Sequence, residues 1–179
     1  MPWTKWDRSV RALIRSPIKW QDRSIRHGQI YILYDPQSNH IKIGRTRNAV
    51  SRRLRDVRKL HGRPHTYHVW SSPLLGAGNL YRLEQLVLTD LKIYQSKYTC
   101  YTCNGRGAIH REWFDIAVED AKLVIMLWYD WLKYRLPYHA TGDLRQEWQL
   151  RTRSMTPDTS ARFADRFDFW RQFAEDEFE

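Results

Sequence analysis

GQIYILYDPQSNHIKIGRTRNAVSRR, residues 28–53, is the stretch of sequence that decides how this chain folds. Residues 29–34 are rich in Ile, Leu and Tyr, which favours a short strand, and the turn-forming residues 35–39 end it. Residues 41–44 then resume the apolar run with Lys42 inserted. The two runs predict a β-hairpin with a longer loop.

A helix is expected directly after this hairpin. Asn48 is the expected N-cap, and the helix runs to about Leu60 with an apolar stripe facing the sheet. At about 3.6 residues per turn, Arg53 lies beside that stripe, whereas Arg52 points away from it. Arg53 is therefore the better placed of the two to reach a site at the sheet surface.

The order and spacing of three short motifs in this stretch carry a family resemblance. The motifs are Ile30-Tyr31, then Lys42-Ile43-Gly44 after the turn, then Arg52-Arg53-Leu54. The series resembles the front half of a GIY-YIG nuclease domain, and most closely the phage and fungal branch (the meiotically up-regulated gene type), whose second motif is commonly KIG. The likeness extends to the REWF segment at residues 111–114 and so covers residues 28–116.

We therefore expect an α+β fold: a small GIY-YIG-like domain with a three- to four-stranded, mainly antiparallel sheet flanked by helices. Periodicity places two further strands and five further helices, at 66–71 and 112–116, and at 3–15, 80–94, after 116 through 134, 143–153 and from 157. The expected organisation is a basic amphipathic extension at 1–27, the domain at 28–136 with an insertion at 96–109, and a C-terminal helical extension at 137–179.

The N-terminal helix has two faces. Trp3, Trp6, Val10 and Ile14 recur at helical spacing, and basic residues occupy the other side. We favour docking of the tryptophan stripe on the domain. Contact of the basic side with a phosphate backbone, or with a membrane surface, remains an alternative.

The charge is concentrated in the first third of the chain. The formal net charge is +10, and residues 1–63 hold 16 Lys and Arg against four Asp and Glu. This asymmetry indicates a polyanionic partner, nucleic acid before membrane, and DNA before RNA. The 42% of hydrophobic residues and nine tryptophans exclude a disordered chain.

No segment resembles a signal peptide or a transmembrane helix. The longest apolar run, Leu123–Tyr129, is far shorter than the roughly 20 residues that cross a bilayer. Two cysteines at C-x-x-C spacing do not make a secreted disulfide framework. An intracellular location is expected, nuclear in a eukaryote.

The helix at 80–94 carries the residue expected to hold a metal ion. Glu84 borders the apolar stripe of this helix, and a partly desolvated carboxylate there requires a cation or a metal as partner. By the resemblance, Glu84 matches the single glutamate with which GIY-YIG nucleases hold a divalent ion. A hard cation held by one carboxylate, waters and phosphate oxygens is typically Mg²⁺, with Mn²⁺ as the substitute.

The resemblance also implies roles for residues of the hairpin and the helix after it. Tyr31 takes the position of the tyrosine that helps to activate the attacking water, and Arg53, or Arg52 if the alignment slips by one, that of the phosphate-facing arginine. Lys42 stands where the second motif usually has tyrosine, and it is expected to hold a phosphate or to lower the pKa of Tyr31. The residues expected to contact nucleic acid are Arg45, Thr46, Arg47, Arg55 and Arg58.

Two further groups are secondary candidates. Glu112 is typical of this branch, and His61 is a candidate proton acceptor. Cys100 and Cys103 form a knuckle that supplies half of a tetrahedral zinc site, with His110 as a third ligand. Because only two cysteines exist in the chain, we favour reduced loop thiols over bound zinc.

The sequence thus predicts a metal-dependent endonuclease that hydrolyses phosphodiester bonds in DNA. The alternative is a nucleic-acid-binding module that keeps the fold and has lost efficient cleavage. A third interpretation is a protein-interaction protein that uses its exposed Trp and Phe stripes.

Overall fold

The computed structural model describes residues 5–18, 27–100, 108–155 and 162–175. The helices are α1 (Lys5–Arg15), α2 (Val50–Leu60), α3 (Ala77–Asp90), the 3₁₀ turn η1 (Leu91–Tyr94), α4 (Val118–Tyr134), α5 (Gln146–Ser154) and α6 (Phe163–Glu175). The strands are β1 (His27–Asp35), β2 (His40–Thr46), β3 (Tyr67–Ser71), β4 (Leu75–Gly76), β5 (Gln95–Cys100) and β6 (Ala108–Phe114). The predicted α+β class is confirmed.

The sheet is antiparallel at every described pairing and is built around the predicted hairpin. Its strand order is β3-β1-β2-β6-β5, and the two-residue β4 pairs with the beginning of β1. In the β1–β2 hairpin Tyr31 lies opposite Gly44, and Leu33 lies opposite Lys42. Directly opposed residues share a face, so these four residues lie on the same side of the sheet.

The sheet has more strands than the three to four predicted, because β5 occupies part of the expected insertion at 96–109. The sequence of β5, QSKYTC, has no continuous apolar run. It is the last strand in the order, and its packing side chains include Tyr98 and the buried Cys100, so the rest of its sequence can be polar. β6 correspondingly begins at Ala108, earlier than predicted.

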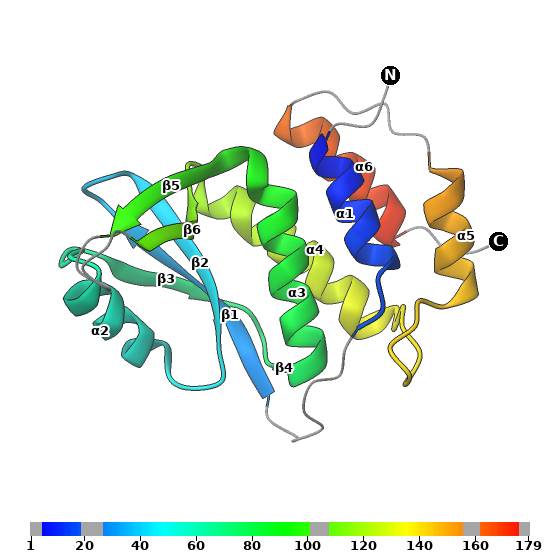
Figure 1. Cartoon of the computed structure of the whole chain (residues 1–179), viewed down its shortest axis with the longest axis horizontal. Coiled ribbons are helices and arrows are strands. Elements are labelled where there is room, and N and C mark those ends of the chain that lie inside the picture. Colours follow the sequence, from blue (N-terminus) through cyan, green and yellow to red (C-terminus); the bar gives the residue numbers. More distant parts are fainter. Residues whose placement is uncertain (1–4, 19–26, 101–107, 156–161, 176–179) are drawn as a thin grey trace.

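Helices cover both faces of the sheet, and Figure 1 shows α2 on one side and the other helices on the opposite side. Ile30 and Ile32 belong to the larger core under α3 and α4, whereas Tyr31 and Leu33 belong to a smaller core under α2. The alternation along β1 therefore buries both of its faces. A functional side chain on the α2 side is thus held between the sheet and a helix.

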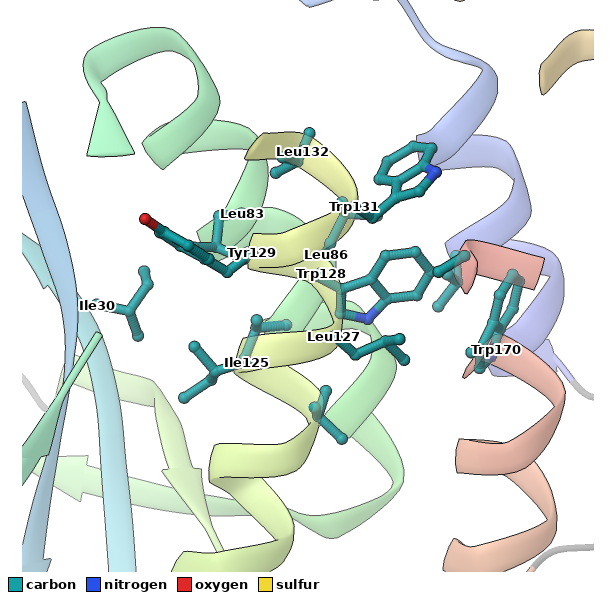
Figure 2. Packing of buried hydrophobic residues seen from close by; sticks show 14 of the residues in the cluster. Ile30, Leu83, Leu86, Ile125, Leu127, Trp128, Tyr129, Trp131, Leu132 and Trp170 are labelled. Atoms are coloured by element: carbon teal, nitrogen blue, oxygen red, sulfur yellow. The ribbon is translucent and has the colours of Figure 1, made fainter. Parts of the chain in front are cut away.

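Aromatic side chains of α4 join the helices into one layer. Figure 2 shows Trp128 and Trp131 directed toward α1 and α6, while Ile125 and Tyr129 are directed toward the sheet. Trp128 and Trp131 pack edge to face with a ring-centroid distance of 5.6 Å, and Trp128 lies 5.5 Å from Trp170 of α6. The terminal helices consequently share one hydrophobic core with the rest of the protein.

Helix α1 docks on α3, in agreement with the role favoured for the N-terminal helix. Val10 and Ile14 are fully buried in the main core. Arg82 of α3 donates hydrogen bonds to backbone carbonyls at the end of α1, including those of Ser16 and Pro17, each at 2.9 Å. A cation there complements the helix dipole. The Trp3 and Trp6 side chains of the predicted stripe lie outside the described part of the chain.

A buried ion-pair network ties α1 and α6 to α3. Arg166 lies 3.1 Å from a carboxylate oxygen of Asp7 and 3.1 Å from one of Asp90. The indole N–H of Trp128 donates to Asp90 at 2.9 Å, and that of Trp170 donates to Asp7 at 3.3 Å. Burial raises the pKa of Asp90 to about 6, although Arg166 lowers it.

A second, partly buried cation braces the hairpin turn. Arg63 pairs with Asp35 and donates to Ser38 at 2.7 Å. Its guanidinium carbon lies 4.1 Å from the ring centroid of Tyr98 and 4.4 Å from that of Trp113. Arg63 therefore links the β1–β2 turn to the β5–β6 hairpin through charge and stacking.

The helix boundaries correct two predictions, and a third prediction lies outside the described residues. The N-cap of α2 is Ala49, not Asn48, because the backbone N–H and C=O of Asn48 bond to the Thr46 hydroxyl at 3.0 and 3.1 Å. Helix α5 begins at Gln146, three residues later than predicted. Helix α6 begins at Phe163, and Pro157, the predicted start, lies outside the described residues.

Candidate functional site

A cavity of about 490 Å³ lies between the sheet and the helices α2 and α3. Its lining residues come from β1, β2 and β6 of the sheet and from both helices. The lining residues that carry chemistry are Tyr31, Lys42, Arg45, Thr46, Arg47, Asn48, Arg53, Asp56, His61, Glu84, His110 and Glu112. Tyr31, Arg53 and Glu84, which come from three different elements, thus lie around one cavity.

Tyr31 lies on the cavity floor over Gly44. A Cβ atom added at Gly44 would meet the phenol oxygen at 2.7 Å, so glycine in the second motif leaves the space that the phenol occupies. Burial raises the pKa of Tyr31 to about 12, Arg53 lowers it, and Glu112, Glu84 and Asp56 raise it. The phenol is therefore neutral at physiological pH.

Glu84 projects from α3 to the cavity and is paired with Arg45 of β2. The Arg45 Nε donates to Glu84 Oε2 at 2.5 Å, and the Arg45 backbone N–H donates to Oε1 at 3.2 Å. The Arg45 guanidinium also stacks over Tyr81, with 4.7 Å from its carbon to the ring centroid. The position of Glu84 on its helix predicted that its carboxylate needs a cationic partner. In this structure that partner is Arg45.

Lys42 forms an ion pair with Glu112, with 2.9 Å between Nζ and Oε2. Burial would raise the pKa of Glu112, but Lys42, together with His110 and a backbone hydrogen bond, lowers it. The expectation that Lys42 lowers the pKa of Tyr31 is wrong: that pKa is raised, and Arg53 is the cation that opposes the rise. The charge of Lys42 is instead paired with the carboxylate of Glu112.

An irregular pairing in β6 brings Glu112 and His110 to the same region. Ser96 of β5 pairs with Trp113 and Tyr98 pairs with His110, so three steps along β6 match two along β5. This register shift re-aims side chains, as β-bulges do near functional sites. His110 Nδ1 lies 3.6 Å from Glu112 Oε2.

The arginines predicted to contact phosphate differ in where they lie. Arg47 and Arg53 line the cavity, and neither side chain forms a hydrogen bond or ion pair with the described part of the protein. Arg52 lines only a smaller neighbouring hollow of about 190 Å³. Arg55 is exposed and borders neither hollow. Arg58 donates to the Thr66 carbonyl at 2.7 Å.

Thr46, also predicted to contact phosphate, is buried, with 3% of its surface exposed. Its hydroxyl bonds to the backbone of Asn48 in the turn before α2. The side chain is therefore used within the protein, and it holds the cavity rim rather than presenting a free hydroxyl.

The sequence did not predict Asp56 as a site residue, and it paired Cys100 with Cys103 rather than with two histidines. Asp56 lies three residues after Arg53 on α2, so the same helical phase would have placed it at the cavity. His61, Cys100 and His110 offer ligand atoms that all lie within 4.8 Å of one another. Cys103, the other half of the predicted knuckle, lies outside the described residues.

The fold and the cavity define a class: an α+β protein with an antiparallel sheet that presents arginines, carboxylates and a buried tyrosine on one concave surface. The T5orf172 domain family matches residues 28–129, more than half of the 179 residues, and the chain belongs to this family. Membership indicates a nuclease-like or DNA-binding function and an interaction with nucleic acid. Comparison with curated proteins and with solved structures finds no match.

The helices give no sign of a membrane span. Within the described ranges, none is both long enough and apolar enough to cross a bilayer.

Proposed function

We propose that this protein is a divalent-metal-dependent endonuclease that hydrolyses phosphodiester bonds in DNA. The observation that carries the proposal is the convergence of Tyr31, Arg53 and Glu84 on one open cavity. The three side chains come from β1, α2 and α3. A protein that only binds nucleic acid would not need these three side chains to lie around one cavity. The resemblance to GIY-YIG nucleases supports the same assignment.

Glu84 is the residue that would hold the metal ion, and its surroundings fit a hard cation. The carboxylate is partly buried, with 19% of the side chain exposed, and already attracts a cationic group, the guanidinium of Arg45. The cavity beside it has room for the waters and phosphate oxygens that complete the shell of Mg²⁺ or Mn²⁺. A bound ion of this kind polarises a phosphoryl oxygen.

Tyr31 and Arg53 would act on the water and the phosphate. Burial raises the pKa of Tyr31 to about 12, which favours the neutral phenol, and a neutral phenol would orient the attacking water by hydrogen bonding. Arg53 has no ion-pair partner within the described residues and faces the cavity. Its guanidinium can meet the negative charge that develops on the phosphate oxygens.

Cleavage of supercoiled and branched DNA in Mg²⁺ tests the proposal. Glu84→Gln and Tyr31→Phe should each lower kcat by about 100-fold or more, the range for losing one positioned catalytic group. Glu119→Gln is the matched control, because Glu119 is 78% exposed on α4 and away from the cavity. Equal activity of Glu84→Gln and the wild type would exclude the proposed role of Glu84.

The pairing of Arg45 with Glu84 gives a sharper test. If Glu84 holds the metal ion, the guanidinium competes with it, and Arg45→Gln should lower the half-saturating Mg²⁺ concentration. The Arg45 side chain is 34% exposed, so solvent screening reduces the pair to about 1 kcal/mol, which is roughly 5-fold in concentration. A higher half-saturating concentration in Arg45→Gln would contradict metal binding at Glu84.

The same ion pairs favour a second candidate, a nucleic-acid-binding module without efficient cleavage. Glu84 is neutralised by Arg45, and Lys42 is neutralised by Glu112, which leaves Arg47 and Arg53 as the cavity's cations without a described partner. A module of this kind would bind DNA with an affinity that falls steeply with salt, and wild type and Glu84→Gln would be equally inert.

A further inference from the structure

We propose that His61, Cys100 and His110 form a zinc-binding site, separate in chemistry from the carboxylate Glu84. His61 follows the last residue of α2, Cys100 ends β5, and His110 lies in β6. One ligand atom from each lies within 4.8 Å of the other two. This inference does not rest on endonuclease activity, because it concerns only what these three side chains bind.

The distances are close to those of a tetrahedral zinc site. Zinc bonds of about 2.3 Å to sulfur and 2.0–2.1 Å to nitrogen place the sulfur and nitrogen ligands about 3.5 Å apart. Cys100 Sγ lies 3.7 Å from His61 Nδ1. The His61 and His110 ring centroids are 4.5 Å apart and the planes are at 76°, so the two imidazoles approach from different directions. Closure around an ion needs only small side-chain movements.

Backbone and side-chain contacts already hold the three ligands in place. The β5–β6 pairing sets Tyr98 opposite His110 and Cys100 opposite Ala108, so Cys100 and His110 lie on the same face of the hairpin. The Tyr98 hydroxyl donates to the His61 carbonyl at 2.7 Å and fixes the end of α2 beside that face. A bound ion would clamp α2 to the edge hairpin.

A carboxylate beside one imidazole supplies the outer contact typical of zinc-bound histidine. Glu112 Oε2 lies 3.6 Å from His110 Nδ1, and Lys42 fixes Glu112 from the other side at 2.9 Å. Such a carboxylate orients the ring and makes the ligand more basic. His61 and His110 also line the cavity, which gives an ion a path to the site.

The ligand set selects the metal. Two imidazoles and a thiolate suit Zn²⁺, whereas Mg²⁺ requires oxygen ligands. Three protein ligands leave a fourth position for water or another group. Cys103, which the C-x-x-C spacing paired with Cys100, lies outside the described residues and is not part of the proposal.

Zinc titration of chelator-treated full-length protein tests the site. The wild type should bind one Zn²⁺ per chain, and Cys100→Ser, His61→Ala and His110→Ala should each lower the affinity at least about 10-fold, the smallest effect usual even for outer-shell residues. His65→Ala is the control, because His65 is exposed and outside the cluster, and it should bind zinc as the wild type does. Unchanged zinc affinity in all three cluster variants would overturn the proposal.

Cobalt substitution keeps the test decisive if a cluster variant folds poorly. Co²⁺ in the wild type should give the visible absorption of a tetrahedral ion and a thiolate charge-transfer band. Zinc should also raise the Tm of the wild type and of His65→Ala. Absence of tetrahedral cobalt absorption in the wild type, or a thiolate band that persists in Cys100→Ser, would refute the site.

Discussion

Arg166→Met removes an arginine that pairs with two buried carboxylates. Arg166 is 4% exposed and lies 3.1 Å from both Asp7 and Asp90. Methionine fills a similar volume but carries no charge, so the variant removes the guanidinium that lies between Asp7 and Asp90. Breaking a buried pair in this way typically costs about 3–5 kcal/mol of the free energy of unfolding. For a chain of this size, that is a fall in Tm of roughly 10 °C.

The pH dependence of that loss follows from Asp90. Its pKa is about 6 in the folded protein, above the ordinary value of 3.8, because burial outweighs Arg166. A group with a raised folded pKa contributes its stability at low pH and loses it as the pH rises through the folded pKa. Removing Arg166 raises the pKa of Asp90 further. The destabilisation should therefore be largest above pH 7 and should shrink as the pH falls below about 6.

Thermal unfolding of both proteins at pH 5 and pH 8 measures this difference. Arg171→Met is the control on the same helix, since Arg171 is 48% exposed and its only ion pair among the described residues is with Asp168 one turn away, a contact worth less than about 0.5 kcal/mol. If Arg166→Met cost less than about 1 kcal/mol at pH 8, or cost the same at both pH values, the account of the buried network would be wrong.

Two further predictions concern the α2 side of the sheet. Gly44→Ala should displace the Tyr31 phenol into the cavity, costing about 1 kcal/mol by urea unfolding and abolishing the cleavage proposed above, whereas Gly76→Ala, with no atom within 4 Å of the added carbon, should do neither. Arg63→Lys should cost about 1–3 kcal/mol at pH 7, because lysine cannot stack between two rings while pairing with Asp35. Burial would raise the pKa of Asp35, but Ser38 and Arg63 lower it, so the difference between Arg63→Lys and wild type should diminish below pH 4 in acid-unfolding experiments.

The central hairpin could be predicted from sequence because local signals agree there. Turn formers separate two apolar runs, and both faces of β1 are buried, so no polar alternation interrupts the pattern. Strand β5 carries no such signal, since an edge strand buries one face and its polar residues match those of a loop. The N-cap of α2 was misplaced because Asn48 bonds backward to Thr46, a contact that spacing alone does not distinguish from a cap.

For the site residues, too, some features could be predicted from local sequence, whereas others depend on tertiary contacts. The positions of Arg53 and Glu84 beside the apolar stripes of their helices could be predicted, because each position depends only on the residue's own helix. Both residues line the cavity. That Glu84 pairs with Arg45, and Lys42 with Glu112, depends on contacts between segments 39 and 70 residues apart. The C-x-x-C spacing directed attention to Cys103, whereas the tertiary structure brings His61, at the end of α2, to Cys100 at the end of β5.

The two proposed metal sites would use ligands that distinguish metals by softness. Glu84 would offer oxygen, and His61 with Cys100 and His110 would offer nitrogen and sulfur. Excess Mg²⁺ should then not displace an ion from the second set, and zinc removal should not change the proposed dependence on a hard cation at Glu84. Loss of cleavage in Glu84→Gln with one zinc retained would place the chemistry at the carboxylate. Loss of cleavage on zinc removal alone would instead show that the clamp between α2 and the edge hairpin holds Arg53 in its catalytic position.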